Sequence, residues 1–269
     1  MAILDAARLQ AGLADETKPV LEQLDVFESV GSTSTFLVEQ AQPAAGRLHV
    51  AIAEQQTAGR GRHNSAWVSP PGAGLYESLA FGVSSSRADF SALTLALGVG
   101  ALNALARFGI EGVALKWPND VVAKDGKLAG ILAETKIRNE QLIVVAGIGI
   151  NVFMDERTRE ASRSGWAQRG VALADLHDSP PELTDLAIAV TDAMAEVFVR
   201  FETEGFAAFA ERWRAADWLY GKTVSVKSPA KTLAGVARGV DDAGALLLET
   251  ADGELAVSSG SVSLLEPAA

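Results

Sequence analysis

The chain has 269 residues, of which 48% are hydrophobic and 21% charged, and its formal net charge is -11. These values predict a soluble globular protein with one large domain, or with a core domain and a small appendage. The lack of cysteine excludes disulfides and thiolate chemistry, the scattered histidines (His49, His63 and His177) argue against a zinc site, and the acidic balance argues against a nucleic-acid surface.

The N-terminal segment carries Asp5, Asp15 and Glu16 and has no basic leader followed by an apolar run. No export signal is visible, so we expect a cytoplasmic protein. The first strand-like run begins too early for a winged-helix or helix-turn-helix domain to precede it, so we expect no repressor function. The longest uncharged run, 90–106, contains polar residues and is typical of a buried helix rather than of a membrane span.

The N-terminal half alternates between strand and helix patterns. Strands are expected at 24–28, 49–54 and 75–83, and helices at 35–42 and 90–108. The run Gly31-Ser32-Thr33-Ser34 supplies N-cap chemistry for the first of these helices. The pattern therefore predicts an α/β core.

From residue 113 the pattern indicates a β-meander. Its strand pieces are 113–117, 121–123, 127–135 and 141–152, followed by a long polar loop at 154–170 and amphipathic helices at 184–204 and 206–213. After Tyr220-Gly221, five short β-runs alternate with turns, at 222–228, 232–240, 245–249, 253–258 and 261–265. That spacing predicts a small β-barrel joined to the core.

A cationic loop, Gly59-Arg60-Gly61-Arg62, stands out in this acidic chain. Glycines allow backbone amides to approach a phosphate, and guanidinium groups pair with it, so the loop indicates a bound anion. A solvated surface turn is the alternative. Gln56 follows a strand and either points into the same site or is an exposed loop residue.

The run Lys116-Trp117-Pro118-Asn119-Asp120 contains a proline that removes a backbone donor and holds the residue before it extended. Asn119 and Asp120 therefore either point into a site or close a proline turn. In a site, Asp120 would hold Mg²⁺ or orient the lysines. Lys127 opens a nearly apolar strand, where it either extends to water or acts as a fixed cation that stabilises charge in a transition state.

A fourth motif, Gly147-Ile148-Gly149-Ile150-Asn151, ends an apolar strand. It is not a dinucleotide fingerprint, because no helix follows in the required frame. The glycines indicate either close approach of a ligand, with Asn151 as a hydrogen-bond partner, or a β-bulge.

Taken in chain order, the motifs described above resemble those of the biotin protein ligase family, and the resemblance runs from about residue 24 to the C-terminus. The matching stretches are Gly31 to Ser34, Glu54 to Arg62, Trp67-Val68-Ser69-Pro70, Lys116 to Asp120, Lys127 to Leu132 and Gly149-Ile150-Asn151. The resemblance implies an α+β fold with a mixed-sheet catalytic core flanked by helices, as in class II synthetases and biotin-lipoate ligases, and a C-terminal SH3-like β-barrel. We expect the core at 1–220 and the barrel at 221–269.

The resemblance also implies a two-step ligation. Biotin carboxylate attacks the α-phosphate of Mg·ATP and gives biotinyl-5′-AMP and pyrophosphate. A lysine amine on a biotin carboxyl carrier domain of a biotin-dependent carboxylase then attacks the mixed anhydride. Both steps need cations around phosphate and a site that excludes water. The implied partners are these small molecules and the carrier domain, and the chain is expected to be a monomer or weak homodimer.

Carried over by motif, the resemblance assigns roles to the residues above. Biotin contacts are implied for Ser32, Thr33, Ser34, Gln56, Arg60, Gly61, Arg62 and Lys127, and ATP contacts for Arg60, Lys116, Asn119, Asn151 and Trp166. Catalytic roles are implied for Lys127, Arg62, Lys116 and Asp120, with Asp120 also as a Mg²⁺ ligand. Ser34 stands where many members have asparagine.

The family loop usually continues Gly-Arg-Gly-Arg-x-Gly-Arg, whereas here His63-Asn64-Ser65 follows Arg62. We expect the turn to survive at Asn64, because asparagine tolerates positive φ, but Ser65 cannot replace a guanidinium. The departure predicts weaker retention of the adenylate. Two alternatives stay open: a lipoate-type ligase, which would be expected to lack the Gly-Arg-Gly-Arg loop, and a non-catalytic biotin-binding regulator, against which Lys127 and Asp120 argue.

Overall fold

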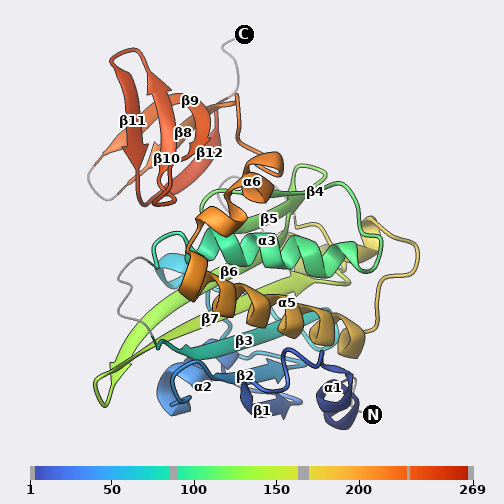
Figure 1. Ribbon diagram of the computed structural model, residues 1–269. Helices are drawn as coiled ribbons and strands as arrows, with labels where there is room; N and C mark the ends of the chain where they lie inside the picture. Colours follow the sequence, from blue (N-terminus) through green and yellow to red (C-terminus); the bar gives the residue numbers. More distant parts are fainter. Residues whose placement is uncertain (1–3, 85–89, 163–169, 229–230, 266–269) are drawn as a thin grey trace.

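Strand-forming segments between residues 21 and 151 pair into one seven-stranded sheet in the computed structural model, which describes residues 4–84, 90–162, 170–228 and 231–265 (Figure 1). Its strands are β1 (Leu21–Phe27), β2 (Leu48–Ala53), β3 (Gly74–Gly82), β4 (Val113–Lys116), β5 (Asp120–Ala123), β6 (Gly126–Arg138) and β7 (Gln141–Asn151). The spatial order is β1-β2-β3-β7-β6-β5-β4. Only the β1–β2 pair is parallel, so the sheet is mixed, and the meander predicted from residue 113 is confirmed.

Helices cover both faces of this sheet. On β2, Val50 and Ile52 belong to one apolar cluster and Ala51 to another, because successive side chains of a strand point to opposite faces. The larger cluster lies under α3 (Leu93–Ala106) and α5 (Leu183–Glu204), and the smaller one under α2 (Thr33–Gln40). Both faces are covered, so β2 and β3 are buried along their whole length.

Lys136 of β6 connects the sheet to the C-terminal end of α2. Its ammonium donates hydrogen bonds to the carbonyl oxygens of Leu37 at 3.0 Å, Val38 at 2.7 Å and Ala41 at 2.7 Å. The Leu37 carbonyl also accepts the amide of the C-cap residue Ala41 at 2.9 Å, and a cation at this end of the helix complements the helix dipole. The lysine therefore fixes α2 on the sheet.

We expect Lys136→Met to lower the free energy of unfolding by about 1–3 kcal/mol, because the charged hydrogen bonds to the end of α2 are lost while the aliphatic stem is kept. Urea unfolding measures this difference. Lys227→Met, at an exposed position of β8 (Thr223–Lys227), is the matched control. Equal unfolding energies for the two variants would contradict the prediction.

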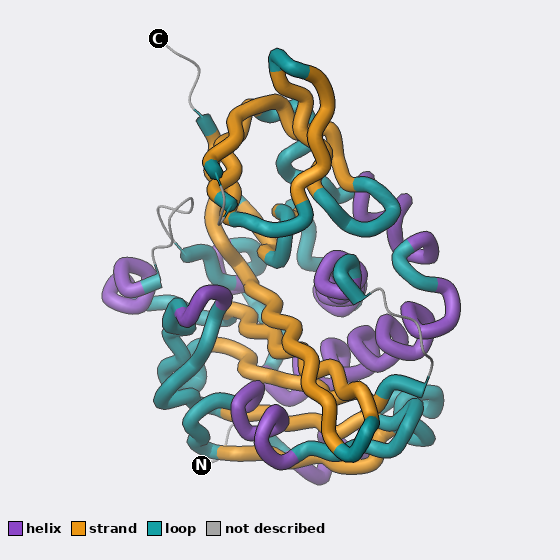
Figure 2. The backbone as a smooth tube through the Cα atoms, turned by 90° about the vertical axis from the view of Figure 1, so that its left-hand side faces the viewer, coloured by secondary structure: helices purple, strands orange, loops and turns teal. Residues whose placement is uncertain are grey.

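The C-terminal segment forms a second, five-stranded antiparallel sheet, which Figure 2 shows as a separate group beside the C-terminus. Its strands are β8, β9 (Thr232–Val240), β10 (Leu246–Thr250), β11 (Gly253–Val257) and β12 (Ser261–Leu264), in the order β11-β10-β9-β8-β12. Each predicted β-run is present. The closed barrel is not, because within the described residues the short β12 pairs with β8 and no ladder joins it to β11.

Within the described residues, three further α-helices frame the core, and two of them differ from expectation. The amphipathic helix expected at 206–213 is α6 (Ala207–Ala215). The expected loop at 154–170 contains α4 (Glu156–Ala161), whose N-cap Asp155 accepts a hydrogen bond from the amide of Thr158. The N-terminal segment contains α1 (Ala6–Gly12), which is joined to α5 by ion pairs of Arg8. In the part of the chain that the structure describes, no helix is both long and apolar enough to cross a bilayer.

Candidate functional site

A cavity of about 590 Å³ opens between the start of α2, the loop after β2, the inner strands of the large sheet and β12. It brings together the predicted site residues Ser32, Thr33, Ser34, Gln56, Arg60, Gly61, Arg62, Lys116, Asn119, Asp120, Lys127 and Asn151. Trp166 lies outside the described residues. The cavity therefore collects motifs that are far apart in the sequence.

The start of α2 forms a polar end of the cavity. Ser32, from the run predicted to cap this helix, is the N-cap and accepts a hydrogen bond from the amide of Thr35, and the helix begins at Thr33 rather than at Thr35. The side-chain oxygen of Gln56 accepts from the backbone amide of Thr33 at 2.9 Å, and the Thr33 hydroxyl lies 2.8 Å from that of Ser78. These buried and partly buried groups are held by one another, so this end is rigid and rich in hydrogen-bonding atoms.

The Gly-Arg-Gly-Arg loop lies beside this polar end. Arg60 forms an ion pair with Glu134 at 2.8 Å and donates to the Thr35 hydroxyl at 3.3 Å. Ser34 donates to the other oxygen of Glu134 at 3.2 Å. Glu134, on β6, thus holds the loop's first arginine against the start of α2.

The second arginine, Arg62, reaches the C-terminal sheet, where its guanidinium donates to the carbonyl oxygen of Gly260 at 3.1 Å. Burial lowers the pKa of Arg62, and the charge of Asp120 acts in the opposite direction. The turn after it was predicted wrongly: His63, with φ 54°, takes the left-handed conformation that we expected at Asn64. Ser65 instead caps this turn by donating to the carbonyl of Arg62.

A cationic centre lies on β4, β5 and β6. The ammonium of Lys127 is 2.7 Å from Oδ1 of Asp120, so Asp120 orients a lysine, one of the two roles expected for it. Lys116 is 2% exposed, and burial lowers its pKa to about 8. The negative charge of Asp120 opposes this shift only in part. Asp120 acts on Lys116, Lys127 and Arg62 alike, so three cations gather at this carboxylate in the part of the chain that the structure describes, and the centre suits an anion.

The glycines of β6 and β7 make room for Trp67. A Cβ atom at Gly149 would lie 2.4 Å from the Trp67 ring, and one at Gly130 would lie 3.0 Å from both Trp67 and Lys127. The Lys127 ammonium is 5.2 Å from the ring centroid. Trp67 is therefore a cavity wall that we did not single out from the sequence, although its matching motif pointed to it.

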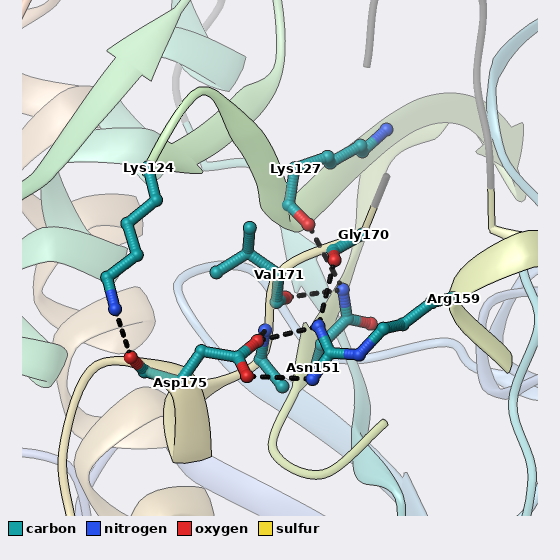
Figure 3. A network of polar contacts seen from close by, with 8 residues as sticks. Lys124, Lys127, Asn151, Arg159, Gly170, Val171 and Asp175 are labelled. Carbon is teal, nitrogen blue, oxygen red and sulfur yellow. Dashed lines mark hydrogen bonds and ion pairs between the residues drawn. The ribbon is translucent and has the colours of Figure 1, made fainter. Parts of the chain in front are cut away.

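Two asparagines that line the cavity also hold its strands together. Asn151 donates to the carbonyl oxygens of Lys127 at 3.2 Å and Val171 at 3.0 Å. Figure 3 shows its side-chain amide between the segment that carries Lys127 and the segment that carries Val171. Asn119 donates to the carbonyl of Ile131 at 2.8 Å. A direct contact of either asparagine with a nucleotide stays a prediction.

The acidic side chains do not form a preassembled metal site. Within the described residues, no three or more histidine, aspartate or glutamate side chains gather where they could hold an ion. Asp120 is the carboxylate at the cationic centre. Because Mg²⁺ is often held by one or two carboxylates together with substrate phosphates, Asp120 suits only that mode of binding.

Comparisons with known proteins agree with this geometry. Family models described as the biotin/lipoate A/B protein ligase family and the biotin protein ligase C terminal domain match residues 26–151 and 220–265. The chain is 34% identical over 241 residues to the bifunctional ligase/repressor BirA of Escherichia coli, covering 86% of this chain and 72% of that protein. It is also 34% identical over 248 residues to the biotin–[acetyl-CoA-carboxylase] ligase of Mycobacterium tuberculosis, covering 89% and 88%.

Among solved structures, the biotin protein ligase from Aquifex aeolicus in complex with biotin and ATP is similar, with a TM-score of 0.73 and 26% identity. The match covers 92% of this chain and 99% of that one. Sequence and structure thus agree over both sheets. The chain belongs to the biotin protein ligase family.

Proposed function

We propose that this chain activates biotin with Mg·ATP to biotinyl-5′-AMP and then transfers biotin to a lysine of a biotin carboxyl carrier domain. The observation that carries this proposal is the meeting, in one cavity, of the polar start of α2 with the cationic centre of Lys116, Lys127 and Arg62. Such a cavity suits a polar ring at one end and a phosphate at the other.

The proposed roles follow from position. Ser32, Thr33, Ser34 and Gln56 hydrogen-bond the biotin ring, and Trp67 packs beside the bound acid. Lys127 stabilises the negative charge that develops as the biotin carboxylate attacks the α-phosphate, and Arg62 and Lys116 add to the same field. Asp120 keeps the Lys127 ammonium in place and, with the phosphates, is available to Mg²⁺.

The remaining expectations belong to the same proposal. The loop of Arg60, Gly61 and Arg62 covers the ligand. The nucleotide is contacted by Asn119, Asn151 and Trp166. We further propose a cytoplasmic monomer or weak homodimer, divided into a ligase core at 1–220 and a C-terminal unit at 221–269, that binds neither nucleic acid nor a membrane.

One experiment separates this function from its alternatives. The chain is incubated with ATP, labelled biotin or labelled lipoate, and a carrier domain, and pyrophosphate and labelled carrier are measured. Pyrophosphate release with biotin and transfer to the biotin carrier are expected. Preference for lipoate would indicate the lipoate-type ligase, and biotin binding without pyrophosphate release would indicate a regulator.

The altered loop motivates a prediction about the intermediate. We expect the double variant Asn64→Gly/Ser65→Arg, which restores the family motif, to release biotinyl-AMP roughly tenfold more slowly, because the added guanidinium gives a charged hydrogen bond to the adenylate. Single-turnover experiments without carrier measure the release. Ser65→Ala adds no charge and is the control. If the double variant released the adenylate as fast as the parent, the prediction would be wrong.

A further inference from the structure

The segment that follows β7 returns to lie beside Lys127. Gly170 pairs with Lys127 in a parallel bridge, and the amide of Val171 donates to the Lys127 carbonyl oxygen at 3.0 Å. The same carbonyl accepts from Asn151. The main chain of Lys127 is therefore held from two sides, by groups that belong to different parts of the chain.

An ion pair joins this returning segment to α4. Arg159, on α4, binds both carboxylate oxygens of Asp175 at 2.7 Å, and its guanidinium also donates to the Gly170 carbonyl at 3.1 Å (Figure 3). The side chains of Arg159 and Asp175 are 14% and 23% exposed. A bidentate, largely buried pair of this kind is stronger and more directional than a surface ion pair.

Asp175 gathers further contacts around the same point. Its carboxylate accepts from the amide of Ala172 at 2.9 Å, and its carbonyl oxygen accepts from the ammonium of Lys124 in the turn just before β6. Figure 3 shows these groups surrounding the segment that carries Gly170 and Val171, while the Lys127 side chain extends away from them. The network thus fixes the backbone of Lys127 and leaves its ammonium to the cavity.

We propose that Arg159 and Asp175 form a latch that positions Lys127 for the adenylation step without touching the substrates. The inference rests on the proposed function, because it assumes that Lys127 acts on the reacting phosphate. The latch acts through Gly170 and Val171: without Arg159, these residues lose their tie to α4, and the Lys127 carbonyl loses a fixed donor. Ala161, Ser162 and Gly170 line the cavity, so the latch also places one of its walls.

The decisive comparison is Arg159→Ala against Arg157→Ala. Arg157 is exposed on the same helix and is the matched control. For Arg159→Ala we expect kcat of pyrophosphate release to fall roughly tenfold to a hundredfold, since small displacements of a catalytic group have effects of that size. We expect KM for biotin to stay within about twofold, because the start of α2 is held by separate contacts. Arg159→Lys should recover part of kcat, and Asp175→Asn should add little to the loss in Arg159→Ala.

Hydrogen exchange of the Val171 amide gives a readout that does not depend on activity. It should accelerate in Arg159→Ala and stay unchanged in Arg157→Ala. Wild-type kcat, or a rise in biotin KM as large as the fall in kcat, would overturn the positioning role, and unchanged Val171 exchange would overturn the latch itself. An inactive parent protein would instead reject the proposed ligase function, and the exchange experiment would still test the latch.

Discussion

Lys127→Ala should lower the rate of biotin-dependent pyrophosphate release by about a hundredfold to a thousandfold, since removal of one group that stabilises transition-state charge costs that much in comparable sites. The ammonium lies at the cavity beside Asp120 and Trp67, and its removal also lowers the positive charge of the centre, because Lys116 and Arg62 then remain as the cations near Asp120. Pyrophosphate release at saturating ATP and biotin measures the effect.

The control for this variant is Lys18→Ala, which removes an exposed lysine whose partner is Asp15 in the N-terminal segment. Circular dichroism and thermal unfolding of Lys127→Ala establish that the fold is intact. Pyrophosphate release at the parental rate by folded Lys127→Ala would refute the assignment of Lys127 as the principal catalytic cation.

Glu77→Gln should remove a pH-dependent loss of stability on the order of 5 kcal/mol, which follows from the pKa shift of this carboxyl. Glu77 is 1% exposed in the core beneath α5, and one of its oxygens accepts a hydrogen bond from Thr191 at 2.7 Å. Its other oxygen, Oε2, has no hydrogen-bond partner among the described residues. Burial raises the pKa of Glu77 from 4.5 to about 8, with Asp192 adding to the rise and Thr191 opposing it.

The sign follows from proton binding. Between pH 4.5 and about 8 the folded chain keeps the Glu77 proton that the unfolded chain has lost, so this group's contribution to stability is present at low pH and disappears as the pH rises through that window. Urea unfolding at pH 5 and pH 8.5 should show a smaller decrease for Glu77→Gln than for the parent. Glu140→Gln, in the exposed turn after β6, is the control. Equal pH dependence in Glu77→Gln and the parent would contradict the prediction.

The strands and long helices could be predicted because each carries its own apolar pattern. The fold class, a mixed-sheet core flanked by helices with an SH3-like C-terminal sheet, is confirmed, although that sheet stays open. The short helices α1 and α4 could not be predicted, because with 7 and 6 residues they show no clear helical period and are held by ion pairs such as Arg8–Asp185 and Arg159–Asp175. Tertiary contacts of this kind leave no periodic signal in the sequence.

In the candidate site, too, local features could be predicted from the sequence and long-range contacts could not. Its motif residues were predictable because each motif is local, and the structure gathers in one cavity those that it describes. The motifs did not reveal the contacts that hold them in place. Glu134 forms an ion pair with Arg60, Trp67 packs against Gly149, and the carbonyl of Gly260 accepts a hydrogen bond from Arg62. Each of these contacts joins segments that are far apart in the chain, so only the folded structure shows them.

The contact between Arg62 and Gly260 has a consequence for how the enzyme is made. The cavity has a wall of Ser261, Val262 and Ser263, which are synthesised after every strand of the large sheet. A nascent chain that has folded its large sheet carries the motifs up to Asn151, yet its cavity is still open to water on this side. The reactive acyl-adenylate can be enclosed only after translation has supplied β12 and the strand has paired with β8.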